Sequence, residues 1–178
     1  MENISSISLT AEEMAEHCLI NYLNEETEKT LKDKRRKNLQ KCFLNFCSSL
    51  LKELQSDEQC ILYFAGVHDY SAFWSLGPYV YMLTNRRLIM VGAYNSKLDF
   101  FNYLQMYKAN WGKNFICKKD SLYLTELKKA TVDMINGYDI IKFHAEEKSF
   151  NVMFFRSNIT HSLCDEINEA LDRIHNFQ

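Results

Sequence analysis

The sequence has little proline and glycine, with one proline and five glycines among 178 residues. That scarcity leaves little room for a flexible linker, so we expect one ordinary domain, or a compact domain with a helical appendage. The first eighteen residues lack the basic and apolar regions of a secretory signal. No apolar run approaches the roughly 20 residues that span a bilayer. These absences predict a cytoplasmic protein.

An excess of one charge is also lacking. The formal net charge is −2, which gives no electrostatic footprint for nucleic acid across the whole molecule. The six cysteines form no CxxC pair, and most lie among apolar residues. This pattern favours reduced, buried thiols over a disulfide framework. The six are Cys18, Cys42, Cys47, Cys60, Cys117 and Cys164.

The motifs of common active sites are missing as well. There is no Gly-rich phosphate loop, no HExxH and no GxSxG. His161 and Cys164 have a spacing compatible with a shared metal, but no second pair at ligand spacing accompanies them. A nucleophile at His17-Cys18 would need an orienting third group and an exposed thiol of low pKa. We therefore expect a protein that is not an enzyme and holds no cofactor and no metal.

The first part of the chain has the period of helices. Thr10 and Glu13 form a capping box at the start of one helix. A second, longer helix is expected from about Glu25 to Leu54, because its apolar residues recur at spacings of three, four, seven and eight. Its first half is polar on nearly all sides, which predicts that it projects into solvent.

After "QSDEQ" the period changes to that of strands. "CILYFAGVH" is a first strand, "YVYMLT" and "RLIMVGAY" form a hairpin, and "LKKATVDMI" and "YDIIKFHA" flank the hairpin signal Asn136-Gly137. "SFNVMFF" is a further strand. The chain closes with an amphipathic helix from about Asn158 to Ile174. An antiparallel sheet with one apolar face needs a cover, and this helix supplies it.

Within the first hairpin, "YMLTNRRLIMVG" places Thr84, Asn85, Arg86 and Arg87 between two apolar strands. Threonine and asparagine suit a turn because their side chains bond local backbone, and arginines can rest their stems on apolar neighbours. The two arginines are therefore interpreted as marking the turn. The alternative is that they bind a phosphate.

This hairpin resembles that of the bacterial pleckstrin-homology-like (PH-like) domains, in which an apolar strand ends in Thr and a second begins with Arg-Leu. Thr84, Arg87 and Leu88 match that pattern. The resemblance covers about residues 57–178 and implies an α+β fold: a bent antiparallel sheet or barrel of six to seven strands, capped by the C-terminal helix. Residues 1–56 form a preceding helical hairpin, expected to pack as an added layer.

Eukaryotic relatives of this fold often bind phosphoinositides through basic residues between the first two strands. Here that loop, "HDYSAFWSLGP", contains no Lys or Arg, which disfavours an anionic membrane as partner. Instead, the loop and a long insert at residues 93–117, expected to be partly helical, are rich in aromatics that either form an interface or pack on the chain itself. The candidate contact residues are Tyr70, Phe73, Trp74, Phe100, Phe101, Tyr107 and Trp111.

One basic run remains, at Lys32, Lys34, Arg35, Arg36 and Lys37, with acidic residues four positions before several basic ones. That spacing favours a solvated helix surface over a nucleic-acid contact. The expected function is a non-catalytic PH-like interaction module that acts through protein contacts or self-association. The alternatives are a peripheral membrane module that binds anionic lipid, a nucleic-acid-binding regulator that uses residues 32–37, and a thiol hydrolase.

Overall fold

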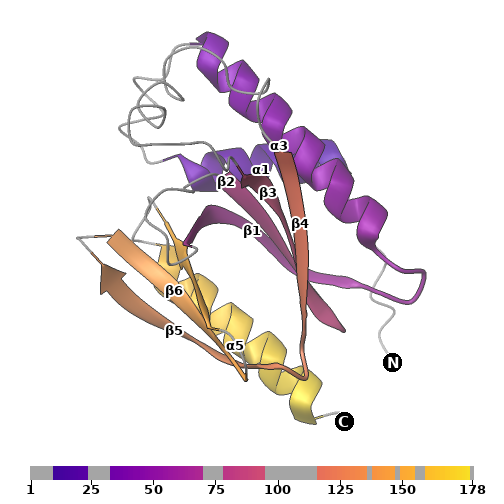
Figure 1. Cartoon of the computed structure of the whole chain (residues 1–178), viewed down its shortest axis with the longest axis vertical. Coiled ribbons are helices and arrows are strands. Elements are labelled where there is room, and N and C mark those ends of the chain that lie inside the picture. The colour runs from indigo at the N-terminus through magenta and orange to yellow at the C-terminus, as the bar shows by residue number, and fades with distance from the viewer. Residues whose placement is uncertain are drawn as a thin grey trace.

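The computed structural model describes residues 10–23, 33–69, 78–94, 116–135, 138–146, 149–154 and 159–176. Two N-terminal helices, a sheet and a C-terminal helix follow one another along the chain (Figure 1). The beginning of the second expected helix, the Asn136-Gly137 turn and Asn158 lie outside the described residues.

The N-terminal layer consists of α1 (Ala11–Tyr22) and α3 (Asp33–Glu53). The predicted capping box is present: the Glu13 backbone N–H donates to the Thr10 hydroxyl, and the Thr10 backbone N–H donates to the Glu13 carboxylate. Such a box satisfies two of the N–H groups that a helix start leaves without partners. The apolar stripes of both helices are buried, as their periods predicted.

Seven antiparallel strands form one sheet in the order β4-β3-β2-β1-β7-β6-β5. Each neighbouring pair consists of strands that are consecutive in the sequence, except β1 and β7, which pair through Val67 with Met153. This order places the first strand beside the last one and leaves β4 and β5 at the two edges. The strands are β1 (Cys60–Asp69), β2 (Pro78–Thr84), β3 (Arg87–Tyr94), β4 (Ile116–Tyr123), β5 (Leu127–Ile135), β6 (Tyr138–Ala145) and β7 (Phe150–Met153).

Both faces of the central strands are covered, which explains why β2 is apolar throughout. On the outer face of β2, Val80 and Met82 point to a core shared with α1 and α3. On its inner face, Tyr79, Tyr81 and Leu83 point to a second core, the inner core, which lies between the sheet and α5. All seven residues of β2 are buried as a result. A strand covered on one face would alternate between apolar and polar residues instead. Figure 1 shows the N-terminal helices and α5 on opposite sides of the strands.

The C-terminal helix α5 (Thr160–Asn176) covers the inner core and also contacts the open edge of the sheet. Cys164, Ile167 and Leu171 supply its buried face. From the same helix, the Asn168 side chain accepts a bond from the Ala130 N–H at 2.9 Å and donates to the Ala130 carbonyl at 3.0 Å. Ala130 belongs to β5, an edge strand, so one side chain satisfies both of its outward backbone groups.

The predicted α+β architecture, an antiparallel sheet of six to seven strands with a closing C-terminal helix, is therefore confirmed, with seven strands. One strand, β4, was not anticipated, and the insert predicted at residues 93–117 begins and ends inside strands β3 and β4. The sequence of β4, "ICKKDSLY", carries polar residues on both faces because it is an edge strand. An edge strand can remain charged where central strands cannot.

The N-terminal helices pack on β1, β2 and β3 of the same chain, as the predicted added layer. Phe43 and Leu50 of α3 share one core with Val67 and Ile89 of the sheet. The predicted boundary between residues 1–56 and 57–178 stays a prediction. In the described part of the chain, no helix has the length and apolar character to cross a membrane.

Gly92 on β3 provides a test of how tightly the inner core is built. It lies opposite Tyr79, and an added Cβ would overlap the tyrosine ring, which is almost completely buried. We expect Gly92→Ala to destabilise the protein by about 1–3 kcal/mol, because the ring has no free space to move into. Urea denaturation measures the change. Ser121→Ala on the exposed face of β4 is the control and should shift stability by less than about 0.5 kcal/mol.

Candidate functional site

The turn between β2 and β3 is closed by the side chain of Thr84. Its hydroxyl oxygen accepts from the backbone N–H groups of Arg86 and Arg87 at 3.1 and 3.0 Å. The hydroxyl proton is within reach of the Arg87 carbonyl at 3.0 Å and of Glu58 Oε1 at 3.3 Å. Because a hydroxyl donates only one hydrogen bond, these two acceptors compete for it. Thr84 thus organises the turn and also contacts the carboxylate beside it.

Arg87 forms a two-pronged ion pair with Glu58. Its Nε donates to Glu58 Oε1 at 2.8 Å and its Nη2 donates to Oε2 at 2.9 Å. The Glu58 side chain is fully enclosed, and the Arg87 side chain is 14% exposed. A guanidinium and a carboxylate match each other in this geometry, which makes the pair directional as well as charged.

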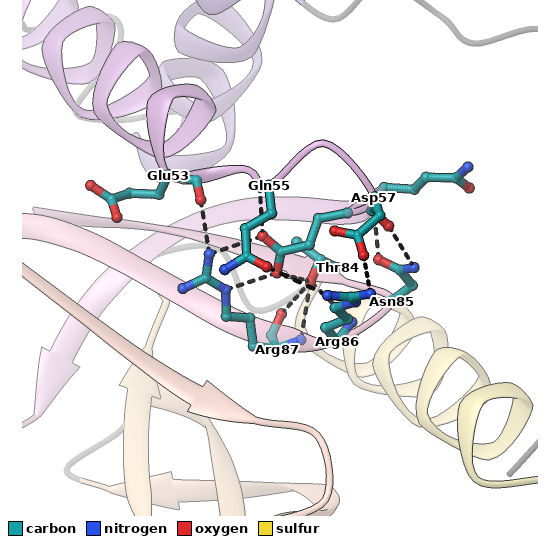
Figure 2. A network of polar contacts seen from close by, with 9 residues as sticks. Glu53, Gln55, Asp57, Thr84, Asn85, Arg86 and Arg87 are labelled. Atoms are coloured by element: carbon teal, nitrogen blue, oxygen red, sulfur yellow. Dashed lines mark hydrogen bonds and ion pairs between the residues drawn. The ribbon is translucent and has the colours of Figure 1, made fainter.

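The same arginine reaches the end of α3. Its Nη2 donates to the carbonyl oxygen of Glu53, the last residue of that helix, at 2.8 Å. The last carbonyls of a helix lack partners within the helix and carry partial negative charge. Arg87 therefore joins the β2–β3 turn, the segment before β1 and the C-terminus of α3. Figure 2 shows the guanidinium between these three elements.

Around this pair, weaker contacts tie the same segments together. Asn85 and Gln59 exchange bonds: the Gln59 N–H donates to Asn85 Oδ1 at 2.9 Å, and the Asn85 N–H donates to the Gln59 carbonyl at 3.2 Å. Arg86 pairs with Asp57, and both side chains are about half exposed. Exposed pairs of this kind contribute little to stability. The buried Glu58–Arg87 pair is therefore the main polar connection of the junction, by which we mean the meeting of the β2–β3 turn, the segment before β1 and the end of α3.

The charge on Glu58 is strongly favoured in the folded state. Hydrogen bonds from the Arg87 guanidinium lower the pKa of this carboxyl to about 2, with smaller contributions from the Gln55 N–H and the Thr84 hydroxyl. Hydrogen bonding to Glu58 in turn raises the pKa of Arg87. Both nitrogens of Arg87 that face the carboxylate are occupied within the chain. This geometry supports the turn interpretation of Arg87 rather than phosphate binding.

Glu58 was missed in the sequence, although one signal pointed to it. The pair spans 29 positions of the chain, so no helical or strand spacing connects them. The antiparallel order of the strands does connect them, because the start of β1 lies beside the end of β2, with Cys60 opposite Thr84. An acidic residue just before the first strand is thereby brought to the turn arginines.

The seven aromatic candidates, Tyr70, Phe73, Trp74, Phe100, Phe101, Tyr107 and Trp111, lie outside the described residues. The strand ends from which their segments leave are described. Residues 70–77 leave β1 after Asp69 and join β2 at Pro78, whereas residues 95–115 leave β3 after Tyr94 and join β4 at Ile116. In the sheet register, Tyr79 is opposite Gly92, and Gly92 is opposite Lys118. Both aromatic segments are therefore attached to the same end of the sheet, opposite the Thr84–Arg87 turn.

The remaining candidates are placed apart from one another. Arg36 and Lys37 of the basic run are exposed on α3, while Lys32 and the side chains of Lys34 and Arg35 lie outside the described residues. His161 is exposed and Cys164 is buried. Within the described ranges, no three acidic, cysteine or histidine residues gather as a metal site would require. Leu88, the last residue of the family pattern, is fully buried in the inner core.

The Cys18 thiol has the opposite character from a catalytic nucleophile. It is fully buried, and a hydrogen bond with Cys47, together with burial, raises its pKa well above the ordinary value for a thiol. Reactive thiols instead have a lowered pKa and are partly exposed. Next to it, His17 contacts the Asn21 amide at 2.9 Å and packs in a T-shaped arrangement with the Tyr63 ring.

Comparison with known proteins gives weak likenesses to solved structures. No protein-family model matches the chain, and no curated protein matches it. Among solved structures, the DH/PH domains of p115-RhoGEF are similar with a TM-score of 0.38 and 10% identity, over 90% of this chain and 53% of that one. The chain thus spans about half the length of that protein chain. A likeness this weak carries no argument, and the description of the fold rests on the strand order and the closing helix alone. The bacterial origin suggested by the sequence resemblance stays a prediction.

If the Glu58–Arg87 pair holds the junction together, Glu58→Gln should destabilise the protein by about 2–4 kcal/mol, because it leaves a largely buried guanidinium without its counter-charge. Glutamine keeps the size of the side chain, so the effect isolates charge. Asp57→Asn removes the exposed pair of the same turn and is the matched control, with an expected loss of less than about 1 kcal/mol. Equal losses in the two variants, measured by urea denaturation, would contradict the role of the buried pair.

The pKa of Glu58 also predicts how stability depends on pH. Its folded value of about 2 lies below the roughly 4.3 of an unfolded glutamate. The contribution of the Glu58–Arg87 pair to the free energy of unfolding is therefore complete above the pKa of the unfolded glutamate. It is lost as pH falls from about 5 towards 2. Unfolding free energies measured across this range should fall more steeply for the wild type than for Glu58→Gln. Parallel curves would show that Glu58 does not titrate as a paired group.

Proposed function

We propose that this chain is a non-catalytic PH-like interaction module that acts in the cytoplasm through contacts with another protein or with a second copy of itself. The observation that carries the proposal is the common attachment of the two aromatic-rich segments. Asp69, Pro78, Tyr94 and Ile116, the four strand ends from which they leave, share one end of the sheet. Tyr, Trp and Phe are the residues enriched where proteins contact each other.

The packing of the sheet supports a contact at its end rather than within it. The outer face of β1, β2 and β3 is covered by α1 and α3. On the inner face, Phe64 stacks on Tyr81, with ring centroids 4.9 Å apart, and Phe143 stacks on Phe150 at 4.8 Å. Side chains of the chain itself fill both faces of β1, β2 and β3. A partner would therefore bind at loops and strand ends, where the aromatic segments leave the sheet.

The opposite end of the sheet is engaged by internal contacts. The Thr84–Arg87 turn bonds the segment before β1 and the last turn of α3. Its most exposed arginine, Arg86, is paired with Asp57. The loop between β1 and β2 contains no Lys or Arg in its sequence, and an anionic headgroup needs several cationic donors. These features favour a protein partner over a lipid surface.

The proposal predicts that aromatics, and not the turn arginine, dominate binding. Trp74→Ala, Phe101→Ala or Trp111→Ala should weaken self-association or partner capture by about 10- to 100-fold, because burying a large aromatic contributes roughly 1.5–3 kcal/mol. Arg86→Ala, at an exposed ion pair, should change it by less than about fivefold. Analytical ultracentrifugation of the purified chain measures self-association, and affinity capture followed by titration measures partner binding.

Each variant must first be shown to fold, by circular dichroism and thermal unfolding. If the wild type stays monomeric and captures no protein, and the aromatic variants only unfold at lower temperature, those side chains belong to the core and the proposal is wrong. Flotation with anionic vesicles tests the lipid alternative, and a salt-dependent shift of DNA or RNA tests the basic run at residues 32–37.

A further inference from the structure

Four of the described cysteines belong to one core, between the N-terminal helices and the outer face of the sheet. Cys18 on α1 and Cys47 on α3 are both fully buried there. Cys42 on α3 and Cys60 on β1 are partly buried against the same core. The proposed interaction function assigns no role to any of them.

The contacts between α1 and α3 bring two of these thiols together. Tyr22 on α1 packs edge-on against Phe43 on α3, with ring centroids 5.3 Å apart. Cys18 lies four residues before Tyr22, and Cys47 lies four residues after Phe43. When two helices run in opposite directions, moving one turn back along the first and one turn forward along the second leads to the next pair of facing residues. The two buried thiols are brought together at that step, and Cys47 is among the causes that raise the pKa of Cys18.

We propose that Cys18 and Cys47 form an oxidation site, at which a small disulfide oxidant converts the two thiols into a disulfide that joins α1 to α3. One protein thiolate attacks a sulfur of the oxidant, forms a mixed disulfide and releases one small thiol. The second protein thiolate then attacks the protein sulfur of that mixed disulfide and releases the second small thiol. The protein loses two electrons and two protons, and the oxidant gains both as two thiols.

Two features of the site determine how the reaction proceeds. The thiols approach each other within a packed core, so the oxidant enters when α1 opens from α3, and the sulfurs then close to the bond length of about 2.0 Å. The thiolate is the attacking species, and a thiol freed by this opening, with an ordinary pKa of about 8.5, is mostly protonated at pH 7. Oxidation should therefore be slow at pH 7 and accelerate at higher pH. This is the behaviour of a protected thiol pair and not of a surface sensor.

The experiment uses the full chain in native buffer, at low protein concentration, with 2-hydroxyethyl disulfide as the oxidant. After free thiols are blocked, intact mass spectrometry measures the loss of two hydrogen atoms. Peptide mapping without reduction then identifies the linked residues. The expected product is a single intramolecular link between Cys18 and Cys47, which dithiothreitol removes and which forms faster at pH 8.5 than at pH 7.

Cys42→Ser and Cys60→Ser are matched controls, because both residues border the same core but are not the paired thiols; each should keep the link. Cys18→Ser should lose it. If that variant does not fold, the peptide map of the wild type decides alone. A mixed disulfide that does not resolve, a link from Cys18 or Cys47 to any other cysteine, or unchanged mass after α1 has been opened with moderate urea would overturn the proposal.

Discussion

The ion pair between Glu58 and Arg87 is the interaction on which the arrangement of the two layers depends. Each partner would be costly to bury alone, since an enclosed charge without a counter-charge has lost its hydration without compensation. Together they satisfy each other, and Arg87 uses a further bond on the last carbonyl of α3. A buried ion pair adds little or no net stability compared with an apolar replacement, but its paired hydrogen bonds require a narrow range of geometries. Its main effect is to fix how the N-terminal helices meet the sheet.

The two ends of the sheet have different properties because of this junction. At one end, the turn between β2 and β3 is bonded to the segment that leaves α3, and its polar groups have partners within the chain. At the other end, the strands continue into segments rich in aromatic residues. Binding modules commonly combine a rigid frame with variable connections of this kind. The frame supplies fixed strand ends, and the connections supply the contact chemistry.

Much of the fold was predictable from local patterns, because those patterns report burial directly. The capping box at Thr10, the hairpins and the amphipathic C-terminal helix each follow from a spacing within a few residues. The strand β4 escaped because it is an edge strand, whose polar residues need no apolar partner. The pairing of Glu58 with Arg87 escaped because it depends on strand order, which no local spacing encodes. The contact role of the aromatic segments stays a prediction, since their residues lie outside the described structure.

The contact between Asn168 and Ala130 has a consequence for how this protein behaves at high concentration. A carboxamide carries the same donor and acceptor as a peptide group, so α5 offers β5 what a neighbouring strand would offer. An open strand edge otherwise invites another chain to extend the sheet, which is a route to fibres and precipitates. Here the position in the middle of that edge is already taken by the chain's own helix. The molecule thus opposes strand-by-strand growth at the β5 edge with a single uncharged side chain.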